Sequence, residues 1–410
     1  MNVIGFIRLL RTIYSKELPD LDFIQRQGLL AVKIGQTYAL RLDFLNEDTC
    51  KHLGKLFRNV DSISADDMEK LLDSYVDKEW RSSFINIDKT PLASASVGQV
   101  HRGQLTDGQD VVIKIIKTDF RKRFIRDVTS LRRFVKFILF FYPKLAKVAD
   151  PLGIIDTIET GTLDELDLCK EIDGHDRLKS IYEKNRTKFD LSKLSFPIIH
   201  RNLSNTNILV SEYIEGKTFD ELLDEKKMTY DMLLDLFHLH GFYVFCIGTF
   251  HGDIHPGNII LRDGQIYFLD TGVISTVGKK MRVGLFDFFD SLSEYDYVKC
   301  AENLNRMAER SISGDAYEQF QEKFLYLYRD YTNSTVSQVS LTKKMMETIK
   351  LGVNSGMVFE KGMYPIIKSL MYLDGMVLRC NPDAMLVKDM RRFIEDFKSI
   401  VYNSAEDAID

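Results

Sequence analysis

The stretch that decides the interpretation of this chain is His251-Gly252-Asp253-Ile254-His255-Pro256-Gly257-Asn258. It separates an acid, Asp253, from an amide, Asn258, by five positions. The apolar runs that follow, joined by the turn Arg262-Asp263-Gly264, predict a β-hairpin. Asp270, followed by Thr271-Gly272, ends the hairpin. We therefore expect Asp270 to return to the side of Asn258.

This spacing matches the catalytic loop of protein kinases, in which an Asp is the base for the substrate hydroxyl, and an Asn and a later Asp hold magnesium. It assigns the base to Asp253 and the metal ligands to Asn258 and Asp270. Mg²⁺ prefers oxygen ligands and offsets the negative charge of nucleotide phosphates. A lone Asp-x-x-x-x-Asn is more often a surface loop, but the hairpin and the second Asp favour catalysis.

Composition limits the function classes. The 410 residues, 45% of them hydrophobic, predict two lobes or domains, and the net charge of -5 gives no indication of nucleic-acid binding. Five scattered cysteines without a CxxC pair predict neither disulfides nor zinc and fit the reducing cytoplasm. No apolar run reaches the roughly 18 residues of a membrane-spanning helix, and no cleavage site follows the N-terminus. We expect a chain that is neither secreted nor transmembrane.

Residues 1–88 are predicted to be almost wholly helical, with breaks at Pro19 and residues 62–64. The first helix has a basic and an apolar face, which could lie on an anionic membrane, although packing on the protein's own core is favoured. Its predicted apolar face consists of Val3, Phe6, Ile7, Leu10, Ile13 and Tyr14. A later helix carries Lys33-Ile34-Gly35-Gln36, a pattern without meaning on spacing alone.

From Pro91 the pattern changes to strands and turns. Ala93-Ser94-Ala95-Ser96-Val97-Gly98-Gln99-Val100 matches the glycine-rich loop of kinases, with alanine at the first two glycine positions. Such a loop brings backbone N–H groups to phosphates, and alanine restricts the left-handed dihedrals that glycine permits. Val111-Val112-Ile113-Lys114 follows as the strand that carries the phosphate-binding lysine. By itself the alanine-rich stretch would be an ordinary turn.

Two helices are predicted between this strand and residue 182. The first, from Phe120 to Lys147, is basic, and aromatic residues outside its apolar stripe favour a lipid or partner surface. The second, over 162–182, carries Glu165, Asp167 and Glu171. Lys114 needs a carboxylate to orient its ammonium group, so one of these acids should pair with it, and we assign Glu171 on the pattern of the kinase family. The alternative is that these acids form a solvated face.

The strand Leu209–Gly216 suits a hinge between lobes, where the backbone of Glu212 and Ile214 would meet adenine. An ordinary edge strand is the alternative. Beyond Asp270 the chain is predicted to be helical, as a C-lobe would be. It contains neither an Ala-Pro-Glu nor a Walker phosphate-binding pattern.

Together these motifs, over residues 25 to 300, resemble the UbiB/ADCK/AarF family of atypical kinases. The resemblance implies an α+β, two-lobed kinase-like fold with an N-terminal helical extension over the active site. It implies regulatory roles for Lys33, Gly35 and Gln36, with Glu165 and Asp167 contacting their helices. Members bind ATP with Mg²⁺, show ATPase rather than ordinary protein kinase activity, act near membranes and support isoprenoid-quinone biosynthesis. ATP, an anionic lipid or a quinone precursor, and peripheral membrane contact are the expected partners.

The expected domains are an extension (1–88), an N-lobe (89–215) with a basic helical insertion at about 118–160, and a C-lobe (216–410). Two departures affect the expected membrane attachment and pathway. Many bacterial members carry C-terminal membrane helices that this sequence lacks, and the usual Pro-Pro is replaced around Asp61-Ser62. Two alternatives stay open: a small-molecule phosphotransferase of the aminoglycoside or choline kinase type, and a non-catalytic nucleotide-binding scaffold.

Overall fold

The computed structural model describes residues 3–15, 17–39, 45, 47–57, 62–117, 120–141, 151–360 and 362–403. The chain forms two units. The first contains residues 1–173 and 197–213, and the second contains residues 174–196 and 214–410. Helix α10 (Leu168–Asn185) carries the chain from the first unit into the second.

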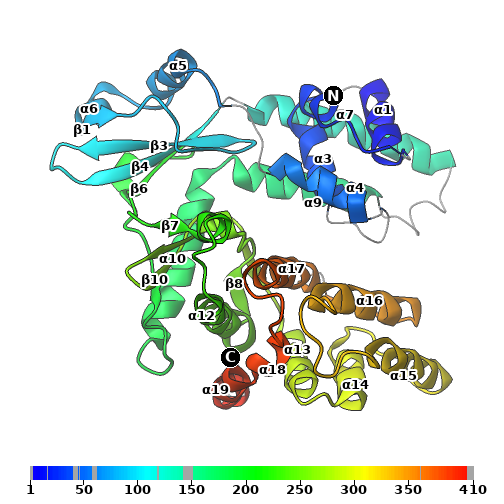
Figure 1. Cartoon of the computed structure of the whole chain (residues 1–410). Coiled ribbons are helices and arrows are strands. Elements are labelled where there is room, and N and C mark those ends of the chain that lie inside the picture. Colours follow the sequence, from blue (N-terminus) through cyan, green and yellow to red (C-terminus); the bar gives the residue numbers. More distant parts are fainter. Residues whose placement is uncertain are drawn as a thin grey trace. The chain divides into compact units, whose positions relative to one another are not determined.

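An antiparallel sheet lies in the first unit, with the strand order β1-β3-β4-β6 and β2 paired to β3 (Figure 1). Its strands are β1 (Phe84–Ile87), β2 (Ala93–Ser94), β3 (Gly98–Leu105), β4 (Asp110–Ile116) and β6 (Ile208–Glu212). Alternate residues of β4 are buried, as expected for a strand with one face on a core. The prediction of helix up to residue 88 is wrong at β1, because its apolar residues complete the sheet against β3.

Helices make up the rest of this unit. They are α1 (Val3–Ile13), α2 (Leu21–Arg26), α3 (Leu29–Ala39), α4 (Glu47–Leu53), η1 (Gly54–Phe57), α5 (Ala65–Tyr75), α6 (Lys78–Ser82), α7 (Phe120–Phe141), α9 (Pro151–Glu165) and η2 (Arg201–Leu203). The predicted apolar face of α1 is partly wrong. Ile13 is buried and Phe6 packs against the same core, but Ile7 and Tyr14 are exposed, and Leu9, which lies outside the predicted face, is buried. The apolar residues of this helix span a wide arc opposite Arg8 and Thr12, so their spacing alone does not fix which of them is buried.

The long basic helix is confirmed as α7 up to Phe141, and residues 142–147 of the prediction lie outside the described residues. Its stripe is buried against α9, where Ile155 and Ile158 belong to the same core. The stripe consists of Phe124, Val128, Leu131 and Val135. The single helix predicted over 162–182 is wrong. The chain breaks after Glu165, and α10 begins at Leu168, whose N–H bonds to the Thr206 carbonyl at 2.9 Å.

The second unit has two small sheets, with strand orders β5-β10-β9-β7 and β11-β8. Their strands are β5 (Leu194–Ser195), β7 (Lys217–Thr218), β8 (Thr249–His251), β9 (Ile259–Arg262), β10 (Gln265–Phe268) and β11 (Ile274–Thr276). The predicted hairpin is confirmed as β9 and β10, with Ile259 opposite Phe268. Asp263 and Gly264 both have positive φ, as a two-residue hairpin turn requires.

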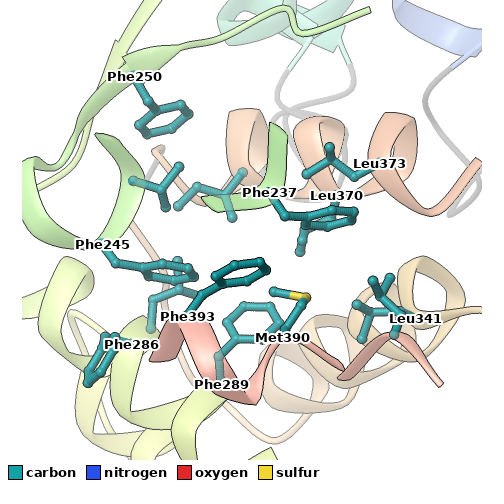
Figure 2. Packing of buried hydrophobic residues seen from close by; sticks show 14 of the residues in the cluster. Phe237, Phe245, Phe250, Phe286, Phe289, Leu341, Leu370, Leu373, Met390 and Phe393 are labelled. Atoms are coloured by element: carbon teal, nitrogen blue, oxygen red, sulfur yellow. The ribbon is translucent and has the colours of Figure 1, made fainter. Parts of the chain in front are cut away.

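The helices of this unit enclose a large apolar core. They are α11 (Phe219–Asp224), α12 (Tyr230–Gly241), the π-helical turn η3 (Phe242–Ile247), η4 (Pro256–Asn258), α13 (Lys279–Ser293), α14 (Tyr297–Met307), α15 (Asp315–Tyr328), α16 (Leu341–Asn354), α17 (Met363–Cys380), α18 (Leu386–Asp389) and α19 (Arg391–Asn403). Figure 2 shows aromatic residues of η3 and α13 packed with Phe393 of α19. This core fixes loop 251–258 on one side, because Phe250 and Ile254 belong to it.

Candidate functional site

Lys114 of β4 and Glu171 of α10 form an ion pair in the first unit. The Lys114 Nζ lies 2.6 Å from the Glu171 Oε2, and the two side chains are 17% and 12% exposed. Glu171 lies in the first turn of α10, where the helix dipole favours a negative charge. The expected pair is therefore present, and it fixes the direction of the Lys114 ammonium group.

The alanine-rich stretch forms a tight turn between β2 and β3. The Ala95 N–H bonds to the Gly98 carbonyl at 2.8 Å, and the Lys117 N–H bonds to the Val97 carbonyl at 2.9 Å. Residues 93–100 are all described, and none has a positive φ. A Cβ on Gly98 would lie 3.0 Å from the Ile115 carbonyl oxygen, so this glycine permits close packing of β3 on β4. The turn closes without the left-handed dihedrals that alanine disfavours.

The Lys-x-Gly-Gln residues join α3 to its neighbours in the first unit. Lys33 forms an ion pair with Glu165 at the end of α9. The Gln36 side-chain amide donates to the Leu56 carbonyl at 2.9 Å. A Cβ on Gly35 would lie 2.6 Å from the Leu56 Cδ1, so a larger residue here would require the Leu56 side chain to move. Asp167 accepts a hydrogen bond from the Cys169 N–H at 3.1 Å, at the start of α10.

At the expected hinge, the Glu212 N–H donates to the Ile198 carbonyl at 2.8 Å. The Glu212 carboxylate accepts from the Ile198 N–H at 3.1 Å. Glu212 ends β6 in the first unit, whereas Ile214 begins the next segment of the second unit and is buried. The backbone N–H of Glu212 is therefore already bonded within its own unit.

In the second unit, His251 joins loop 251–258 to the segment that precedes Asp270. Its Nε2 lies 2.9 Å from the Leu269 carbonyl, and its Nδ1 accepts from the Asp253 N–H at 3.1 Å. One donor and one acceptor are what a neutral imidazole provides. Burial lowers the pKa of His251, which keeps the ring neutral. Sequence reasoning did not assign this positioning role, although the residue opens the quoted motif.

Asn258 lies between Asp253 and Asp270. Its side-chain N–H donates to the Asp253 backbone carbonyl at 3.1 Å, and its backbone carbonyl accepts from the Leu269 N–H at 2.8 Å. The side-chain nitrogen of Asn258 is thus bonded within the loop, and its side-chain oxygen is the atom that could coordinate a metal. Asp270 adopts a left-handed conformation with φ of 46°. The hairpin therefore returns to place the residue before Asp270 against Asn258, as expected.

The chemistry of these side chains fits Mg²⁺. Mg²⁺ is usually held by one or two carboxylates, with water and substrate phosphates completing its shell. Asp270 offers one carboxylate, and Asn258 offers an amide oxygen. Among the described residues there is no group of three or more His, Cys, Asp or Glu side chains that could hold a metal by itself.

Asp253 has a partner that sequence reasoning missed. The Lys368 Nζ, from α17, lies 3.0 Å from the Asp253 Oδ1. The two side chains are 16% and 27% exposed. Lys368 follows Asp253 by more than a hundred positions and carries no motif, so the sequence gives no signal for this contact.

Comparison with known proteins decides the family. The model of the ABC1 atypical kinase-like domain matches residues 55–304. The chain belongs to this family. An uncharacterized protein from the hydrogenase 1 5' region of Clostridium pasteurianum is 26% identical over 88% of this chain and 67% of its own length. A probable protein kinase UbiB of Tolumonas auensis is 25% identical over 90% of this chain and 68% of its own length.

A solved structure supports the fold. The complex of Rv3197 with erythromycin from Mycobacterium tuberculosis aligns with a TM-score of 0.52 and 19% identity, over 93% of this chain and 95% of that one. The expected α+β, two-lobed kinase-like fold is confirmed, and so is the resemblance to the UbiB and AarF proteins. Among the described residues, no helix is both long and apolar enough to cross a membrane.

Proposed function

We propose that this chain binds ATP with Mg²⁺ and transfers or hydrolyses the γ-phosphoryl group. The observation that carries the proposal is the Lys114–Glu171 ion pair at 2.6 Å. In kinases, a strand next to the phosphate-binding turn carries a lysine whose ammonium group is oriented by a carboxylate. This ammonium group binds the α- and β-phosphates. Asn258 and Asp270 are the proposed magnesium ligands, and bound Mg²⁺ would offset the phosphate charge.

In the proposed reaction Asp253 is the base. Its carboxylate accepts the hydrogen bond of the acceptor O–H, which is water in an ATPase, and takes the proton. The acceptor oxygen bonds to the γ-phosphorus while the bond from this phosphorus to the β,γ-bridging oxygen breaks, and ADP leaves. Lys114 binds the phosphates that depart, and His251 keeps Asp253 in place through the hydrogen bond at 3.1 Å.

Slow hydrolysis rather than protein phosphorylation is the proposed activity. The turn that would cover the phosphates closes through the Ala95–Gly98 hydrogen bond without positive φ, and alanine stiffens it. Lys33, Gly35 and Gln36 are proposed to regulate access by holding the N-terminal extension over the site. Their contacts with Glu165 and Leu56 support a rigid extension.

We place the activity in isoprenoid-quinone or lipid metabolism at a membrane surface. Support comes from the similarity to UbiB proteins and from α7, where Phe137, Phe140 and Phe141 are 63%, 79% and 58% exposed beside exposed Arg133 and Lys136. Aromatic groups next to basic ones suit an anionic bilayer. Flotation with anionic liposomes should show binding that weakens as salt rises. Absence of binding would remove the membrane from the proposal.

The test of the activity is Mg²⁺-dependent ATP hydrolysis by wild type and Asp253→Asn, with and without anionic liposomes. Asp263→Asn is the matched control, because this acid lies 90% exposed in the hairpin turn. Only Asp253→Asn should lose turnover, by a factor of a hundred or more in order of magnitude, since it removes the base. Tight binding of ATP without turnover by wild type would favour the non-catalytic scaffold instead.

A further inference from the structure

We propose that Lys368 is a positioning residue of the phosphoryl-transfer site, holding the Asp253 carboxylate and adding a positive charge beside the transferred phosphoryl group. The proposal rests on the proposed function. It concerns a helix, α17, that lies beyond the residues matched by the family model, 55–304.

The ion pair is the first observation. The Asp253 Oδ1 is buried and has no aligned hydrogen bond within the part of the chain that the structure describes. The Lys368 Nζ at 3.0 Å supplies the opposite charge to this oxygen. A buried carboxylate oxygen without such a charge would be costly, because burial removes the water that otherwise solvates it.

The second observation is that α17 holds Lys368 rigidly. Leu370 and Leu373 of this helix are buried, and Figure 2 shows both beside Phe237 of α12. Tyr372, one turn after Lys368, packs its ring edge-to-face against His255 of the catalytic loop, with centroids 5.2 Å apart. The Lys368 Nζ lies 5.7 Å from the same tyrosine ring. Helix and loop therefore meet at two successive turns.

The third observation is the charge of the loop itself. Residues 251–258 contain no lysine or arginine. During transfer the acceptor oxygen must contact both the Asp253 carboxylate and the γ-phosphorus. A cation bound to that carboxylate therefore lies close to the phosphoryl oxygens, on which negative charge accumulates. Lys368 supplies this charge from a distant part of the chain.

The first test needs no activity. Thermal unfolding midpoints are measured for wild type, Lys368→Met, Asp253→Asn and the double variant. If the two side chains form a pair in solution, the double variant should lose less than the sum of the two single losses. Additive losses would show that the contact is absent in solution and would overturn this proposal while leaving the proposed function intact.

The second test separates positioning from binding. We expect Lys368→Met to lower the kcat of ATP hydrolysis at least tenfold, and Lys368→Arg to keep it within threefold, with the Kd of Mg·ATP changed less than threefold in both. Arg379→Met is the matched control, because Arg379 lies on the same helix and pairs instead with Asp220 and Asp224 at 2.9 and 2.6 Å.

Unchanged turnover in Lys368→Met would overturn the proposal. Faster turnover would overturn it as well, because the ion pair would then inhibit the reaction. A Kd for Mg·ATP that rises in step with the fall in kcat would overturn it as well. Wild type that binds Mg·ATP without turnover would refute the proposed function and this proposal together. The unfolding midpoints would still report whether the ion pair exists.

Discussion

Replacing Gly174 by alanine should destabilise the protein, although alanine normally strengthens a helix. Gly174 lies in α10, and a Cβ at this position would meet the Thr271 carbonyl oxygen at 1.9 Å, in the segment that follows Asp270. Real Cβ contacts essentially never fall below 3.0 Å, so helix and segment must separate by 3.0 − 1.9 = 1.1 Å. The clashing atom belongs to the backbone and cannot rotate away.

Overpacking of this kind costs about 1–3 kcal/mol, against a gain of roughly 0.5–1 kcal/mol from the better helix former. We expect a net loss of up to about 2.5 kcal/mol in the free energy of unfolding, and each kcal/mol lost lowers the midpoint by about 2–4 °C in a domain of this size. Mg·ATP affinity should fall too, because Thr271 adjoins Asp270.

The assay is thermal unfolding with calorimetric titration of Mg·ATP. Gly375→Ala in α17 is the control, because a Cβ there has no atom within 4 Å. This variant should be stabilised by up to roughly 1 kcal/mol. If Gly174→Ala proved as stable as Gly375→Ala, the close approach of α10 to the segment after Asp270 would be refuted.

Three further predictions follow from local chemistry. Ala93→Gly or Ala95→Gly should change ATP affinity and release autophosphorylation, measured with radiolabelled ATP; equal labelling of wild type and both variants would contradict the restraint assigned to these alanines. Phosphatase treatment should leave ATP turnover unchanged, because Gly252 stands where many kinases have the arginine that binds a phosphorylated activation loop, and glycine has no side chain to bind it. Burial lowers the pKa of His240 to about 3, whereas the unfolded chain protonates near 6.5, so stability falls as pH drops between these values. At pH 5 this loss is about 2 kcal/mol by linkage, and denaturant unfolding of His240→Leu at pH 7 and 5 should lack it.

Spacing predicted the parts of the site that lie close together in sequence. The hairpin between Asn258 and Asp270 follows from its turn and its alternating apolar residues, and both are local properties of the chain. The Lys114–Glu171 pair spans a longer separation, and its prediction depends on the family pattern rather than on spacing alone. The roles of these residues remain predictions.

Contacts set by packing could not be predicted. The break between α9 and α10 depends on the Leu168 N–H meeting the Thr206 carbonyl, a partner far along the chain. Which residues of the wide apolar arc of α1 are buried depends on its packing against α3 and α7. Lys368 reaches Asp253 only through the packing of the C-terminal helices, which no local pattern records.

The central claim is that Asn258 and Asp270 hold Mg²⁺ for a bound nucleotide. Calorimetric titration of Mg·ATP into wild type and Asp270→Asn tests it most directly. Because the variant loses an oxygen ligand and its charge, we predict that the Kd rises at least about tenfold, on the order of 1.4 kcal/mol. Equal affinity of wild type and Asp270→Asn for Mg·ATP would contradict the kinase-like metal site.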